Sequence, residues 1–262
     1  MHFEIRELHG AKDIKGVIDL QEKIGGLPPR DTMSPITLAA LTMQHPRIGW
    51  VLGGFDGDTM AGFFVGMAAA SPGLAFGHMM GVLNEYRDTG LGAQLLHVAA
   101  KWFARSGMRR ICWTYEPLES RNAHLYINKL GARCVTYLKD HYLLDSGIHH
   151  GMPQDRLLLE VDLPVNMGAR HKPVLLGQVI DRYPIAQPGA LPSGDEILLE
   201  IPGDLRRLQA RDATTALRWR MESRGLFEEC INQRKMTADR FYTGLDGEQR
   251  RSFYLFRRSP RL

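Results

Sequence analysis

Two hydrophobic periodicities alternate along the first 163 residues of the chain. Short runs in which apolar and charged side chains alternate, or in which apolar residues follow one another, predict strands, whereas apolar residues three and four positions apart predict helices. The strands are expected at residues 3–8, 49–55, 60–69, 109–115, 134–144 and 157–163, and the helices at residues 11–24, 35–44 and 120–130. Residues 74–105, in the middle of this series, predict an apolar strand, a glycine-containing turn and an amphipathic helix.

Turn and cap residues mark the ends of several elements. Ser34 precedes Pro35 at the start of the second helix, where serine is a favourable N-cap and proline suits the first turn. The tripeptide at 56–58, Asp-Gly-Asp, separates two strands and signals a hairpin. Gly131 follows the helix at 120–130 as a favourable C-cap. The predicted order is β-α-α-β-β-β-α-β-α-β-β.

The C-terminal part of the chain carries a different pattern. Residues 164–196 are rich in proline and glycine and predict a connector with one short strand at 174–180. Beyond it we expect a strand, a long helix that breaks near Gly225, and two closing strands. These elements are predicted to begin at residues 197, 204, 237 and 252.

Composition limits the class of protein. The chain has 262 residues, of which 44% are hydrophobic and 24% charged, as in ordinary globular proteins. No apolar run approaches the roughly 20 residues of a membrane helix, and the first ten residues lack the apolar core of a signal peptide. The three cysteines lie far apart, so we expect no disulfide framework and a cytoplasmic protein. The net charge of +4 suits an anionic ligand. The basic residues are scattered apart from the tail RRSFYLFRR at 250–258, on which nucleic-acid binding would rest as a third alternative, so we expect no nucleic acid as a partner. The lack of a long apolar run means that we expect no membrane either.

The glycine-containing turn is the most informative stretch. It reads Arg87-Asp88-Thr89-Gly90-Leu91-Gly92 and opens the amphipathic helix. The first backbone N–H groups of a helix have no partner inside it and point outward with the positive end of the helix dipole. Glycine lets a ligand approach this backbone closely. The turn therefore predicts an anion site, for which phosphate is the usual occupant.

These features resemble the GNAT (GCN5-related N-acetyltransferase) superfamily. Its acyl-CoA pyrophosphate loop reads Arg/Gln-x-x-Gly-x-Gly/Ala, and Arg87, Gly90 and Gly92 match that pattern. A second stretch, Asn122-Ala123-x-x-Tyr126-x-x-x-Leu130-Gly131, resembles the family motif Asn-x-x-Ala-x-x-Leu-Tyr-x-x-x-Gly-Phe. It departs from that motif by an Asn–Ala spacing one residue shorter and by Ala132 in the aromatic position.

The predicted element order is also the GNAT order. The resemblance implies an α/β (α+β) GNAT fold, a mixed and mostly antiparallel sheet whose central strands splay apart around acyl-CoA. The expected organisation is a GNAT domain at 1–163, a connector at 164–196, and a half-GNAT-like strand-helix-strand-strand segment at 197–262 packed on the first domain.

The resemblance implies acetyl-CoA or another acyl-CoA as co-substrate. The family binds pantetheine and polarises the thioester carbonyl with backbone N–H groups of the strand before the loop. The implied CoA contacts in this sequence are Gly81, Val82, Leu83, Arg87, Asp88, Thr89, Gly90, Leu91, Gly92 and Asn122. For Asn122 the alternative is a polar residue in the first turn of a helix.

Three residues are candidates for proton transfer. Tyr126 lies where many GNAT enzymes place a tyrosine that protonates the CoA thiolate; the alternative is a core aromatic. His78 is a candidate base because imidazole titrates near neutral pH, and the alternative is a strand histidine that only forms hydrogen bonds. Glu116 is a second candidate base at the end of its strand, with a solvated turn residue as the alternative. Many enzymes of this class use ordered water instead of a dedicated base.

For the remaining reactive side chains the sequence favours structural or surface positions over catalytic or metal-binding ones. Cys112 lies in an apolar strand and is expected to be a buried thiol. His149 and His150 are adjacent on a loop with no acidic or cysteine partner at usable spacing, so we expect no metal site.

The expected function is an acyl-CoA-dependent N-acyltransferase that uses an amine of a small molecule or peptide as acceptor. The acyl group is expected to be acetyl, and the amine attacks the thioester directly. The alternative is a catalytically inactive CoA-binding module whose C-terminal segment has a regulatory or partner-binding function. A homodimer is a further partner arrangement that the sequence leaves open.

Overall fold

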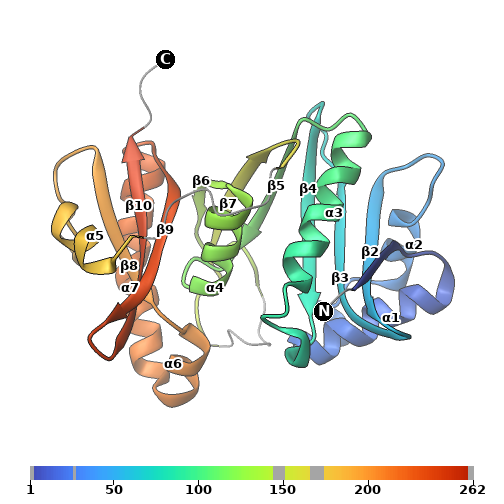
Figure 1. Ribbon diagram of the computed structural model, residues 1–262, viewed down its shortest axis with the longest axis horizontal. Coiled ribbons are helices and arrows are strands. Elements are labelled where there is room, and N and C mark those ends of the chain that lie inside the picture. Colours follow the sequence, from blue (N-terminus) through green and yellow to red (C-terminus); the bar gives the residue numbers. More distant parts are fainter. Residues whose placement is uncertain (1–2, 26–27, 144–150, 166–173, 259–262) are drawn as a thin grey trace. The chain divides into compact units, whose positions relative to one another are not determined.

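The computed structural model describes residues 3–25, 28–143, 151–165 and 174–258. It divides into two compact units (Figure 1). The first unit contains the described residues up to Trp113 together with residues 162–165. The second contains residues 114–143 and 151–161 together with the C-terminal part of the chain. The domain boundaries expected at residues 163 and 197 stay a prediction.

The first unit is built on β1 to β5. Strands β1 to β4 are antiparallel neighbours in chain order, and β5 pairs with β4 in parallel. The strands are β1 (Glu4–Glu7), β2 (Gly49–Asp56), β3 (Thr59–Ala68), β4 (Leu74–Val82) and β5 (Arg110–Tyr115). The helical segments are α1 (Gly10–Gly25), η1 (Pro29–Asp31), α2 (Pro35–Leu41), η2 (Asn84–Tyr86) and α3 (Leu91–Arg105).

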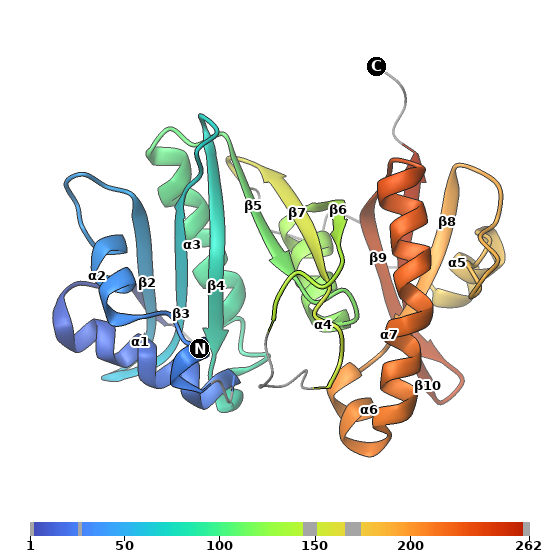
Figure 2. The same ribbon diagram turned by 180° about the vertical axis from the view of Figure 1, so that it is seen from behind.

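Helices cover both faces of this sheet. Helices α1 and α2 pack on one face through a core that includes Val17, Leu38 and Phe63 (Figure 2). Helix α3 covers the other face (Figure 1). A β-carbon on Gly54 would lie 2.6 Å from the Leu91 side chain, so the small residue is what permits the close approach of α3.

The second unit is built on a sheet in the order β7-β6-β9-β10-β8, with antiparallel neighbours. Strands β6 and β7 come from the first part of the chain and β8 to β10 from the C-terminal segment, so the two parts share one sheet. The strands are β6 (Arg133–Leu138), β7 (Arg156–Asp162), β8 (Glu196–Pro202), β9 (Met236–Asp246) and β10 (Gln249–Arg258). The helical segments are α4 (Ser120–Ala123), η3 (His124–Leu130), α5 (Leu176–Arg182), α6 (Leu205–Arg211), α7 (Ala213–Phe227) and η4 (Glu228–Gln233), with π-helical geometry in η3 and η4.

The predicted α/β class and mostly antiparallel sheet are confirmed, but two C-terminal predictions are wrong. The predicted strand at 174–180 is instead helix α5, because Leu176, Val179 and Tyr183 lie on one helical face and pack against Leu198 and Phe253.

The long helix also does not break at Gly225. It is interrupted earlier, at Asp212, whose carboxylate caps α7 by accepting the Thr215 N–H at 2.9 Å. It then continues through Gly225, because burial of Leu226 and Phe227 offsets the unfavourable helix propensity of glycine.

Candidate functional site

The start of α3 has the backbone geometry expected of an anion site. Gly90 precedes the helix with φ of 91°, a left-handed conformation that favours glycine. The first helical hydrogen bond runs from the Gln94 N–H to the Gly90 carbonyl at 3.0 Å. The N–H groups of Leu91, Gly92 and Ala93 therefore precede the helical ladder and have no acceptor within it.

The turn before this helix is fixed by its own backbone and side chains. The Arg87 N–H donates to the Asn84 carbonyl at 3.2 Å and closes η2. The Thr89 hydroxyl donates to the Tyr86 carbonyl at 2.7 Å. Asp88 adopts φ of 63°, which aspartate tolerates better than most residues. The predicted loop residues thus form one ordered turn directly before α3.

Strand β4 leads into this turn, and its pairing changes at Gly77. Its ladder with β5 extends only from Leu74–Arg110 to Gly77–Trp113. At the same place the register with β3 shifts, because Gly66 faces Gly77 and Val65 faces Met79. His78 is therefore the extra residue of a β-bulge, a feature that bends a strand and is frequent beside active sites. Beyond the bulge, β4 continues to pair with β3 alone.

Antiparallel geometry decides which N–H groups of β4 face away from β3. The Leu83 N–H donates to the Ala61 carbonyl at 2.9 Å, so it faces β3. Because orientation alternates along a strand, the Gly81 N–H also faces β3, and those of Met80 and Val82 face the opposite edge. Of the three predicted strand residues, only Val82 directs its N–H there. Met80, which the sequence analysis missed, is the second such donor.

Gly92 lies beside these two donors. A β-carbon on Gly92 would contact Met80 Cε and Val82 Cγ2 at 3.8 Å each, which is ordinary van der Waals distance. The helix start thus lies beside the end of β4, and a side chain on Gly92 would enter the corner between them. Outward-pointing N–H groups at the helix start and at the strand edge suit an elongated ligand with a pyrophosphate and an amide arm, and the residues present fit acyl-CoA.

His78 is the candidate base of the first unit. Its ring is exposed and lies 6.3 Å from the Phe76 ring, centroid to centroid. Desolvation by the protein atoms around it lowers the pKa of His78. The lowered pKa favours the neutral imidazole, the form that can accept a proton.

Tyr126 and Asn122 belong to the second unit. Tyr126 lies on η3, is 7% exposed, and packs edge-on against Tyr115 at a centroid distance of 5.4 Å. Burial, followed by the negative charge of Glu119, raises the pKa of Tyr126, so its phenol is protonated at neutral pH. Asn122 is half-buried on α4. Both lie at a change from α- to π-helix, which is frequent at functional sites, and their functions stay predictions.

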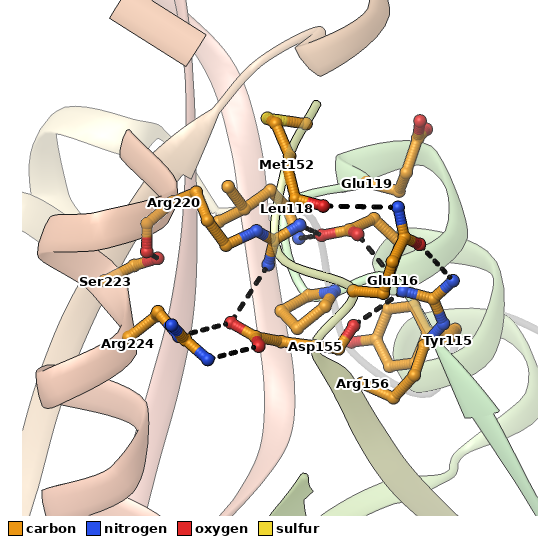
Figure 3. A network of polar contacts seen from close by, with 12 residues as sticks. Tyr115, Glu116, Leu118, Glu119, Met152, Asp155, Arg156, Arg220, Ser223 and Arg224 are labelled. Atoms are coloured by element: carbon orange, nitrogen blue, oxygen red, sulfur yellow. Dashed lines mark hydrogen bonds and ion pairs between the residues drawn. The ribbon is translucent and has the colours of Figure 1, made fainter. Parts of the chain in front are cut away.

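Glu116, the other candidate base, is not a solvated turn residue. It is 5% exposed, and Figure 3 shows its carboxylate inside a network of arginines. Oε1 accepts hydrogen bonds from the Arg220 guanidinium and, at 3.0 Å, from the Leu118 N–H. Oε2 pairs with Arg156 Nη1 at 3.4 Å. Protein groups thus engage both carboxylate oxygens, and the function of Glu116 as a base stays a prediction.

The network continues from Arg220 to a second buried carboxylate, Asp155. Arg220 Nη1 lies 3.8 Å from Asp155 Oδ2, and both side chains are fully buried. Asp155 also pairs with Arg224 at 3.1 Å and accepts a hydrogen bond from the Tyr137 hydroxyl at 2.5 Å. These residues could not be predicted from the sequence, because an Arg-x-x-x-Arg spacing on a helix is usual on a solvated face.

The cysteines and the paired histidines are the other reactive side chains that the sequence singles out. Cys112, Cys134 and Cys230 are buried free thiols, which confirms the expectation for Cys112. His149 and His150 lie outside the described residues. Within the described ranges, no group of three or more His, Cys, Asp or Glu side chains is placed to hold a metal ion. None of the helices in those same ranges is long and apolar enough to cross a membrane.

Comparison with known proteins agrees with this geometry. Residues 19–132 match the model of the Acetyltransferase (GNAT) family. Over these residues the chain resembles a GNAT acetyltransferase domain, which confirms for this stretch the resemblance predicted from the sequence. No curated protein matches the chain.

Solved structures show the same fold at low sequence identity. An acetyltransferase of the GNAT family from Streptococcus pneumoniae is 18% identical, with a TM-score of 0.52, and the match covers 62% of this chain and all of that one. The ribosomal-protein-S18-alanine N-acetyltransferase from Escherichia coli is 16% identical, with a TM-score of 0.51, and the match covers 66% of this chain and all of that one. Arabidopsis thaliana NAA60, solved with acetyl-CoA, is 15% identical, with a TM-score of 0.51, and the match covers 62% and 99%.

Proposed function

We propose that this protein is an acyl-CoA-dependent N-acyltransferase that transfers an acetyl group to an amine of a small molecule or a peptide. The observation that carries the proposal is the corner where Leu91, Gly92 and Ala93 at the helix start face the edge of β4 that bears Met80 and Val82. The GNAT family match over residues 19–132 supports it. The buried free thiols suit a cytoplasmic location, which is part of the proposal.

Each part of the corner has a distinct task in this proposal. The N–H groups at the start of α3 bind phosphate oxygens, with the helix dipole as a further stabilising term. The outward N–H groups of Met80 and Val82 bind the amide arm and polarise a carbonyl, as in an oxyanion hole. Bound acyl-CoA supplies an activated thioester. Holding both reactants in place contributes a large part of the rate.

The proton transfers fall to side chains. His78, whose lowered pKa favours the neutral imidazole, accepts a proton from the ammonium group of the acceptor, directly or through water, so that the neutral amine can attack the thioester carbonyl. The family resemblance assigns the return of a proton to the leaving thiolate to Tyr126, whose raised pKa keeps the phenol protonated.

The direct experiment is acetyl transfer to a panel of amines. The protein is incubated with acetyl-CoA and small amines, polyamines or peptides with free N-termini, and the release of free thiol is followed. Amine-dependent release together with an acetylated product supports the proposal. Acetyl-CoA binding without release for any amine would favour the second candidate, a CoA-binding module without catalysis. The engagement of both Glu116 oxygens by protein groups favours that second candidate.

Replacing Tyr126 by phenylalanine tests the proposed acid. The substitution removes one hydroxyl and keeps the ring on Tyr115, so stability and acetyl-CoA binding are expected to change little. If the phenol protonates the thiolate, kcat should fall by about 10²–10⁴-fold with KM for acetyl-CoA close to wild type. Wild-type turnover in the Phe variant would leave Tyr126 as a packing residue.

A further inference from the structure

Two segments of the second unit have the same sequence of local structures. In each, an α-helix changes into a π-helical turn, a left-handed residue follows, and an antiparallel pair of strands completes the segment. The first segment is α4-η3-β6-β7 and the second is α7-η4-β9-β10. From the helix through the first strand of each segment, equivalent residues lie at a constant offset of 104 positions, and the dipeptide Ile127-Asn128 recurs as Ile231-Asn232.

The irregular features of the two segments coincide at this offset. The change from α- to π-helix follows Ala123 in one and Phe227 in the other. The left-handed residues are Gly131, with φ of 77°, and Lys235, with φ of 55°. A left-handed lysine is uncommon, so the shared conformation follows the local fold and not a glycine preference.

The strands repeat a further irregularity. In the β6–β7 ladder the register skips Val135, because Cys134 faces Leu159 and Thr136 faces Leu158. In the β9–β10 ladder it skips Asp239, because Ala238 faces Phe256 and Arg240 faces Leu255. Residues 135 and 239 are again 104 positions apart. Both strands therefore carry the same bulge at the same place.

The asparagines of the two segments form reciprocal contacts. Asn128 donates to the Phe241 carbonyl at 2.7 Å and accepts the Phe241 N–H at 3.2 Å. Asn232 donates to the Tyr137 carbonyl at 2.9 Å and accepts the Tyr137 N–H at 3.2 Å. Each asparagine thus clamps the backbone of the other segment's first strand, at equivalent residues. Such exchange of identical contacts defines an interface with two-fold symmetry.

The two segments also meet at equivalent residues. Strands β6 and β9 pair through Cys134 and Ala238, which are themselves 104 positions apart. A residue that faces its own equivalent across an antiparallel pair lies on the two-fold axis. Both side chains are fully buried.

We propose that the second unit is an internal pair of half-repeats, and that the C-terminal copy is the partner that covers the β6 edge of the acetyltransferase domain as a second subunit would. An uncovered strand edge invites pairing with another chain, and here a copy of the same unit within the chain occupies it. The two copies have diverged in chemistry, because Cys230 stands at the position equivalent to Tyr126, and helix α5 and β8, without the glycine turn, precede the second copy. The proposal stands on contacts inside the second unit and is independent of acyl transfer.

Reciprocity gives a test by amide hydrogen exchange in the full chain. Asn128→Ala is expected to raise exchange of the Phe241 amide, and Asn232→Ala that of the Tyr137 amide, by about tenfold or more each. The two variants should lower the melting temperature by similar amounts. Lys129→Ala and Gln233→Ala, exposed neighbours at equivalent positions, are matched controls that should change neither quantity. A loss confined to one asparagine, or exchange that rises in the variant's own segment instead of the opposite one, would overturn the two-fold pairing.

A cross-link tests whether the partner lies in the same chain. Directly opposed residues of antiparallel strands lie about 4.5–5.5 Å apart at Cα, within the range that a disulfide spans. Ala238→Cys should therefore form a disulfide with Cys134 on mild oxidation, with the chain keeping its monomer mass on a non-reducing gel. Wild type, treated in the same way, should keep its free thiols. A doubled mass through this bond would show that another chain supplies the strand and would overturn the intrachain partner. Absence of the bond together with unchanged exchange in both asparagine variants would overturn the pairing itself.

Discussion

Acetyl-CoA binding should fall by about 100-fold or more when Gly92 is replaced by valine, an affinity change of roughly 2.7 kcal/mol. The β-carbon would enter the corner between the start of α3 and the edge of β4, where Met80 and Val82 lie 3.8 Å from it. The branched side chain beyond it would occupy the space that the phosphate oxygens need beside the helix N–H groups. Isothermal titration calorimetry with acetyl-CoA measures the effect.

The structure also explains why the fold should survive this change. No neighbour lies closer to the Gly92 β-carbon than an ordinary contact distance, and its φ is not in the left-handed region. Gly90 is a poorer test, because its φ of 91° would strain the backbone of any substitute. A loss of acetyl-CoA affinity could then come from that strain as well as from ligand exclusion.

A second Leu-Gly pair in the chain provides the control. Gly177 is the second residue of α5, as Gly92 is of α3, and nothing lies within 4 Å of its β-carbon position. Gly177→Val should therefore leave acetyl-CoA affinity and melting temperature near wild type. Unchanged affinity in a folded Gly92→Val variant would remove the corner as the acyl-CoA site.

Local sequence signals were sufficient to predict the order of the elements in the first 163 residues. Hairpin turns, helix caps and periodicity each depend on neighbouring residues, so the elements from β1 to β7 could be predicted in order. Helix α5 could not, because its segment, Val174 to Ile180, is apolar at both the strand and the helix period. The helix is favoured over the strand because Leu176 and Val179 pack on Phe253, a residue far along the chain.

The candidate site likewise has features that depend on neighbouring residues and features that depend on distant ones. The glycine turn is local, and its spacing alone indicated an anion site. The outward donors of β4 depend on the register with β3 and on the bulge at His78, neither of which leaves a mark in the sequence. The surroundings of Glu116 depend on Arg220, from the C-terminal segment. A long-range ion pair of this kind has no local pattern.

Loss of the Arg220 side chain is expected to be the most destabilising single truncation in the polar network of the second unit. Arg220→Ala leaves Glu116 and Asp155 buried, at 5% and 0% exposure, without the guanidinium between them. Removing one partner of a buried ion pair typically costs about 3–5 kcal/mol, because the remaining charge stays desolvated. Urea denaturation of the full chain, with the transition of the second unit followed by hydrogen exchange in β10, measures this loss.

The matched control removes an arginine from the surface of the same unit. Arg257 pairs with Asp239 where both side chains are partly exposed, and such pairs contribute about 0–1 kcal/mol. Arg257→Ala should therefore shift the transition little. Equal losses in the two variants would mean that Arg220 is not the counter-ion that holds the two carboxylates.

A compensating variant separates lost charge balance from lost packing. Arg220→Met keeps most of the side-chain volume and removes the positive charge, and Glu116→Gln removes one of the two negative charges that it balanced. If the penalty is electrostatic, the double variant should regain a substantial part of the stability that Arg220→Met loses, because one buried carboxylate instead of two then lacks the Arg220 charge. Additive losses would instead assign the effect to packing around α7. Recovery would show that the C-terminal segment stabilises the β5–α4 turn by charge, since Glu116 belongs to that turn and Arg220 to α7.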